Sequence, residues 1–207
     1  MKKRRHILMI AVVLCLLATA LAGAYWNAQR EADSLPSSAV DASLPLAEFQ
    51  GEKVYRSDVE NQMRSFSALG IENQKMEKEM LMEILQNMVL YQEAIRLGYA
   101  ATQSEIDALV TNNKQTYDIP EGKAMIDQYC ANADITVDEY FAYLEAQVPR
   151  TIARQKLLDA VGKQYCDQHG LTFTKVNPPK EMADAQDAYV TELFAQAQGE
   201  IIYSDNK

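Results

Sequence analysis

Apolar residues recur every three or four positions along most of the chain, which is the spacing of an amphipathic α-helix. The longest uninterrupted stretch of this kind runs from about residue 72 to residue 97 and ends at Gly98. Its apolar stripe consists of Met76, Met80, Ile84, Met88, Tyr91 and Ile95. Further stretches with the same spacing lie on both sides, so the chain is predicted to be mostly helical.

Several helix starts are marked by a hydroxyl residue followed three positions later by an acidic one. In such a capping box, each of the two side chains binds a free amide of the first turn. The pattern begins at Ser57, Thr102 and Thr136, and Pro120 occupies a position that a first helical turn accepts. The stretch after Thr136 is long and contains Pro149, which is predicted to bend or divide the helix just before it.

Two short segments near the ends of the body interrupt the helical pattern. Residues 46–54 are predicted to form a hairpin that turns at Gln50-Gly51, and residues 200–203 a terminal strand. A lone hairpin is marginal in water, so we expect the terminal strand to pair with the first one, in either direction. The predicted fold class is mostly α, a multi-helix lobe with a small two- or three-stranded sheet joining its N- and C-terminal ends.

The first 26 residues differ from the rest. Residues 2–5 are all basic, and the twenty residues from Ile7 to Trp26 carry no charge, enough for a helix across a hydrocarbon core of ~30 Å. The basic cluster places the N-terminus in the cytoplasm. The segment is either a cleaved signal peptide or an uncleaved transmembrane anchor. Residues 27–45 are a flexible linker, and residues 46–207 are the domain outside the membrane.

The charge of this outer part bears on its partners. The whole chain has a net charge of −9, and all 29 acidic residues follow residue 30, whereas 5 of the 20 basic residues precede residue 31. Residues 31–207 therefore carry 15 basic and 29 acidic side chains, a net charge of −14. Such a surface repels phosphate backbones, which argues against a nucleic-acid partner.

Little in the sequence supports catalysis, a cofactor or a metal site. The two histidines, His6 and His169, have no metal-ligand spacing around them, and there is no nucleophile motif or glycine-rich phosphate loop. Cys130 and Cys166 could form a disulfide in an oxidising compartment, or they could be small buried apolar residues. Both alternatives remain open at this point.

Four blocks of residues resemble the N-terminal domain of the SurA and PrsA foldases. Residues 46–59 resemble the family's hairpin and helix start, although Gln50 replaces the usual Asn. The most specific block, residues 85–99, is similar to the family's L-x-x-E-A-x-x-L-G stretch. Residues 102–106 and 135–140 resemble the openings of its next helix and of its long helix.

This resemblance implies a chaperone lobe that shields unfolded exported polypeptides by burying their apolar side chains. It also implies that no isomerase activity is present, because the family's prolyl-isomerase domain has no room between Gly170 and Pro178. Flexible thioether side chains suit varied clients, or they fill the core. The candidate client-binding residues are Met63, Phe66, Met76, Met80, Met82, Met88 and Tyr91.

Two functions follow. The first is a membrane-tethered extracytoplasmic chaperone that binds unfolded exported polypeptides. The second is a helical interaction subunit dedicated to one cell-envelope or secretion partner, and a prolyl isomerase is a distant third. The expected location is the cell membrane with the body outside, or secretion if the leader is cleaved. The sequence leaves the oligomeric state open.

Overall fold

The computed structural model describes residues 44–69 and 77–204. These residues form six α-helices and a three-stranded antiparallel sheet, which confirms the predicted mostly helical class. None of the described helices is long and apolar enough to cross a membrane. The predicted leader, nearly all of the linker, and Met76 lie outside the described residues.

The sheet joins the two ends of the domain, as predicted. β1 (Ala47–Phe49) pairs with β2 (Glu52–Val54) and also with β3 (Ile202–Tyr203), giving the order β2-β1-β3. The turn between β1 and β2 has φ angles of 49° at Gln50 and 85° at Gly51, as expected for a tight hairpin with a primed turn. The register places Ala47 opposite both Val54 and Tyr203.

The first described helix, α3 (Arg56–Ala68), does not begin at the predicted capping box. Tyr55 is the N-cap residue, and its backbone N–H donates to the Asp58 carboxylate at 2.7 Å. The start predicted at Ser57 is therefore wrong. The helix begins directly after β2, because Asp58 already satisfies the amide at its entrance.

The other predicted helix starts are confirmed. α5 (Gln103–Tyr117) and α7 (Val137–His169) begin with capping boxes, in which the backbone N–H of Thr102 donates to Glu105 at 2.8 Å and that of Thr136 to Glu139 at 2.6 Å. Pro occupies the first turn of α6 (Pro120–Ala133). α4 (Glu77–Arg96) is followed by Gly98 with a φ of 82°.

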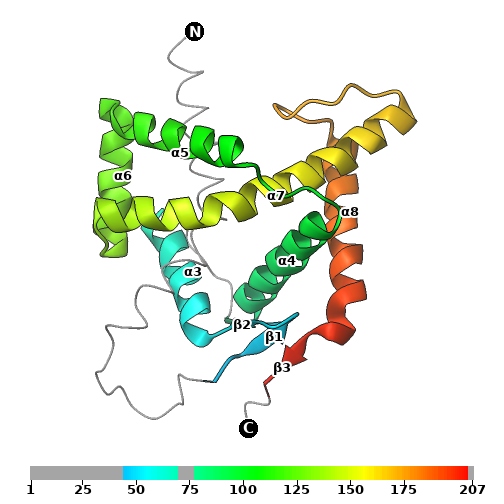
Figure 1. The fold of residues 1–207 in the computed structure, drawn as a ribbon, viewed down its shortest axis with the longest axis horizontal. Helices are drawn as coiled ribbons and strands as arrows, with labels where there is room; N and C mark the ends of the chain where they lie inside the picture. The colour runs from blue at the N-terminus through cyan, green and yellow to red at the C-terminus, as the bar shows by residue number, and fades with distance from the viewer. Residues whose placement is uncertain (1–43, 70–76, 205–207) are drawn as a thin grey trace.

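The long helix α7 contains Pro149 but is not divided by it. Proline removes one backbone donor, and the remaining bonds hold the helix together from Val137 to His169. Its axis changes direction along its length in Figure 1, so the bend is present and the division is not. Residues 170–179 then lead to α8 (Lys180–Ala197) and the 3-10 turn η1 (Gln198–Glu200).

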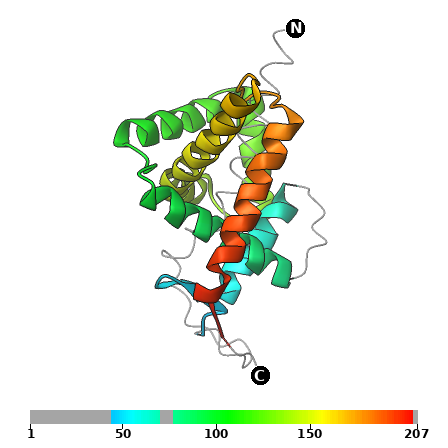
Figure 2. The ribbon, with the colours of Figure 1, turned by 90° about the vertical axis from the view of Figure 1, so that its right-hand side faces the viewer.

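α7 is the central element of the fold. Figure 1 shows it crossing the molecule, with α5 above it, α6 at one end, and α3, α4 and α8 extending from its level toward the sheet. Its first part packs on α5 and α6, and its later part on α4 and α8. Figure 2 shows α8 running the length of the molecule from α7 to the sheet.

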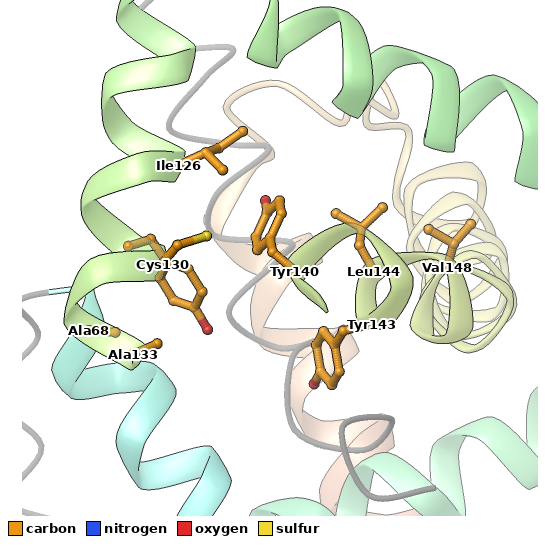
Figure 3. Close-up of a cluster of buried hydrophobic side chains, with 9 residues drawn as sticks. Ala68, Ile126, Cys130, Ala133, Tyr140, Tyr143, Leu144 and Val148 are labelled. Atoms are coloured by element: carbon orange, nitrogen blue, oxygen red, sulfur yellow. The ribbon is translucent and has the colours of Figure 1, made fainter. Parts of the chain in front are cut away.

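A cluster of tyrosines and small apolar residues forms the core at the α6 end, and we call it the tyrosine core. Its buried members are Ala68, Ile126, Tyr129, Cys130, Ala133, Tyr140, Tyr143, Leu144 and Val148. Figure 3 shows Tyr140 and Tyr143 pointing in opposite directions from α7. The Tyr140 ring meets that of Tyr129 edge-on, with 5.7 Å between the centroids.

Candidate functional site

Six of the seven apolar residues predicted to bind clients lie in the described part of the chain, and two of these six are buried. Met80 and Met88 are buried, so their assignment as client-binding residues is wrong and they are core residues. The physical reason is the position of α4, which packs against α3, α7, α8 and the sheet. A helix surrounded on so many sides buries residues all around its axis rather than along one stripe.

The other four described candidates are partly buried at the edges of the core. Met63 and Phe66 pack beside α4, and Met82 lies beside the sheet, where the Tyr203 hydroxyl is 3.7 Å from its sulfur. Tyr91 lies under the Arg150 guanidinium, 4.8 Å from the ring centroid to Cζ. These four side chains retain some accessible surface.

The two cysteines outside the leader are both buried and free. Cys130 packs beside Tyr140 in the tyrosine core, whereas Cys166 lies 26 residues beyond Tyr140 on α7. That separation is about 39 Å along the axis at 1.5 Å per residue. A disulfide needs Cα atoms within ~7 Å, so the disulfide alternative is excluded and both residues are small buried side chains, the other alternative.

His169 has a structural role at the end of α7. Its Nδ1 lies 2.8 Å from the Tyr165 carbonyl oxygen, and its ring stacks on that of Tyr165. Among the described residues, no group of histidine, cysteine, aspartate and glutamate side chains could hold a metal ion.

The unusual feature of the interior is a row of buried polar residues on α7. Gln147, Thr151 and Arg154 follow one another at spacings of four and three, so they share one face of the helix. We call this row the polar seam. All three are buried in a helix whose other buried residues are mostly apolar. Sequence reasoning missed the seam, although polar residues at helical spacing inside an apolar stretch are a readable signal.

Several buried polar atoms have no hydrogen-bond partner among the described residues. They are Gln62 Oε1 on α3 and Tyr140 Oη, Thr151 Oγ1 and Arg154 Nε on α7. Buried polar atoms are nearly always paired, and each exception costs free energy. These four atoms, one on α3 and three on α7, can be satisfied by solvent or by a bound molecule.

The surroundings of Arg154 also leave its charge incompletely compensated. Its Nη1 donates to Asn87 Oδ1 on α4, a neutral acceptor. Burial first, and then the nearby charge of Arg150, lower the Arg154 pKa to about 10. The group therefore stays charged at neutral pH in a place that disfavours its charge.

A small hollow lies next to the tyrosine core, between α3, α6 and the start of α7. Its volume is about 30 Å³, room for one or two water molecules. Arg64, Ser65, Tyr129, Ile135 and Tyr143 contribute to its lining. The Tyr129 hydroxyl donates to Ser65 Oγ at 3.3 Å, and Arg64 is exposed. The hollow thus combines two aromatic walls with polar groups and a cationic side chain.

No family model, curated protein or solved structure matches this protein. The resemblance to the foldase family therefore stays a prediction. The geometry of the seam and the hollow carries the functional argument.

Proposed function

We propose that this protein is an extracytoplasmic chaperone, tethered to the membrane by its N-terminal segment, that binds unfolded segments of exported polypeptides. The binding region is the hollow between α3, α6 and α7 together with the polar seam of α7. It acts as a holdase without isomerase activity, since residues 170–179, between α7 and α8, are too few for a catalytic domain.

The observation that carries the proposal is the set of four buried polar atoms without a partner among the described residues, which lie on α3 and α7, two of the helices that border the aromatic hollow. A polypeptide backbone offers one donor and one acceptor per residue, so it can satisfy Gln62 Oε1 as an acceptor and Arg154 Nε as a donor. Tyr129 and Tyr143 are themselves buried, and the hollow beside their rings offers a small group of the client an aromatic contact. Neither type of contact demands a particular client sequence.

The order of the elements also supports the proposal. The N-terminal hairpin, the helices and the returning C-terminal strand occur in the order that the resemblance implies. The apolar contribution is smaller than the methionine pattern suggested, because Met80 and Met88 are in the core. Client binding in this proposal relies more on hydrogen bonds and aromatic side chains than on a methionine-lined groove.

A second candidate function is a subunit bound to one fixed partner. Its supporting observation is β3, where Ile202 and Tyr203 are exposed at an outer strand of the sheet. An edge strand with free backbone groups can accept a strand from another protein. Such a contact would be specific and permanent rather than broad.

Aggregation assays separate the two. Residues 31–207, or the full-length protein in detergent, should suppress the aggregation of several unrelated unfolded proteins. They should not accelerate X-Pro isomerisation, whose time constant should stay at the uncatalysed tens to hundreds of seconds. A single tight partner in a pull-down, with no suppression of aggregation, would favour the dedicated subunit and overturn the chaperone.

A further inference from the structure

Arg154 is a buried cation with no anionic partner in residues 44–69 and 77–204. Only 8% of the residue is exposed. Within the part of the protein that the structure describes, no carboxylate lies within ion-pair distance of it. Removing a guanidinium from water without such a partner is costly, and buried charges in proteins are normally paired. The buried charge of Arg154 therefore lacks the anionic group that would offset its loss of hydration.

The neighbouring residues do not supply that group. Arg150, one turn earlier, carries the same charge, and it is itself committed to Glu52 at 2.7 Å and to the ring of Tyr91. Asn87 offers a neutral oxygen to Nη1 and leaves Nε without a partner. The net local charge is therefore positive.

Thr151 adds a second free donor on the same face of α7. Its Oγ1 is buried without a partner, three residues before Arg154. Asn87 and Arg150, which adjoin Arg154, are both only partly buried. The guanidinium is thus buried next to two side chains that are themselves in contact with solvent.

We propose that Arg154 and Thr151 form a subsite for a carboxylate group of the bound polypeptide, an inference that rests on the proposed function. A carboxylate accepts parallel hydrogen bonds from a guanidinium and one more from a hydroxyl, and it neutralises the buried charge. The same chemistry comes from the C-terminus of a polypeptide or from an aspartate or glutamate side chain. The subsite gives an otherwise sequence-tolerant region one preferred anchor.

Three matched peptides test the subsite with the full-length protein in mild detergent. One apolar ten-residue peptide carries a free C-terminal carboxylate, the second is its C-terminal amide, and the third is the amide with one internal aspartate. Fluorescence anisotropy should show the carboxylate peptides binding about ten-fold more tightly than the amide. Tighter binding of the first or the third peptide identifies the source of the carboxylate.

Two variants connect this preference to the subsite. Arg154→Met should reduce the ratio of affinities to about one, and Thr151→Val should reduce it several-fold while Arg154 stays in place. The control Arg96→Met, which removes an exposed arginine at the end of α4, should leave the ratio unchanged. Arg154→Met should also keep or raise the melting temperature, because it removes an unpaired buried charge.

A second readout needs no peptide. Sodium acetate should raise the melting temperature of the unaltered protein more than sodium chloride of equal ionic strength does. Arg154→Met should abolish that difference.

The outcomes distinguish a failure of the carboxylate subsite from a failure of the chaperone proposal. Equal binding of acid and amide peptides overturns the subsite and leaves the chaperone intact. If no peptide binds, the chaperone proposal fails, and the acetate arm alone decides whether a carboxylate site exists. A sharp fall in melting temperature on Arg154→Met, with no acetate effect in the unaltered protein, would show that Arg154 is a structural residue.

Discussion

Helix α7 buries two different surfaces on neighbouring turns. Tyr140, Leu144 and Val148 enter the tyrosine core, where apolar packing stabilises the fold. Gln147, Thr151 and Arg154 form the polar seam, where a charge and a hydroxyl are buried with incomplete hydrogen bonding. The first surface explains why the helix folds here. The polar seam lowers the stability of the fold, so we explain its presence by a role in binding.

The largest expected effect separates the two surfaces by stability alone. Leu144 is fully buried, and Leu144→Ala should cost roughly 2–5 kcal/mol, a fall in melting temperature on the order of 10 °C. Thr151→Val in the seam should leave the melting temperature unchanged or raise it, because it removes a hydroxyl without a partner. Thermal unfolding followed by circular dichroism measures both. A large loss in Thr151→Val would contradict the division of α7 into two surfaces.

The sheet provides a second contrast, between two adjacent isoleucines. Ile201 is buried against β1 and α4, whereas Ile202 is 66% exposed on β3. Ile201→Ala should therefore cost about 2 kcal/mol or more, and Ile202→Ala should stay within about 0.5 kcal/mol. Deletion of residues 200–207 should lower the melting temperature by several degrees, as Ile201→Ala does. If both isoleucine variants behave alike, the sheet does not close the domain in this way.

Two tyrosines test the cost of an unpaired hydroxyl inside the tyrosine core. The Tyr129 hydroxyl is bonded to Ser65, whereas that of Tyr140 has no partner. Tyr129→Phe should lower stability by about 1 kcal/mol, and Tyr140→Phe should raise it by a similar amount. Denaturant titration of both variants measures the change in their free energy of unfolding. A loss of stability in Tyr140→Phe would mean that the Tyr140 hydroxyl does have a hydrogen-bond partner.

The smallest effect concerns the cap of α5 and depends on pH. The N–H of Thr102 and then Lys156 lower the pKa of Glu105 from 4.5 to about 2. A lowered folded-state pKa adds stability above the ordinary value, which is lost as the pH falls toward about 2. The melting temperature of the unaltered protein should exceed that of Glu105→Gln by a few degrees near pH 6. A gap that stays constant down to pH 2 would contradict this assignment.

Local sequence signals predicted much of the fold. The capping boxes at Thr102 and Thr136 succeeded because a cap depends on residues within one turn. The hairpin turn at Gln50-Gly51 is equally local. The predicted start at Ser57 was wrong because the Tyr55 N–H donates to Asp58. The residue spacing alone does not show which of the two caps forms.

The candidate site was predicted poorly because it depends on how helices meet. Whether Met80 is core or surface is decided by the helices around α4, which no periodicity within α4 reveals. The distance between Cys130 and Cys166 likewise depends on the unbroken length of α7. The polar seam is different, since the spacing of Gln147, Thr151 and Arg154 was visible in the sequence.

Site-specific photo-crosslinking tests most directly the claim that clients bind beside α7. A benzophenone amino acid at Arg64, in the lining of the hollow, is compared with one at Ala188, which is exposed on α8. The probe is a reduced, carboxymethylated protein that stays unfolded, and the full-length protein in detergent is irradiated with it. We predict strong crosslinks from position 64 and weak ones from position 188. Equal crosslinking from both positions, or crosslinking mainly from α8, would contradict the account.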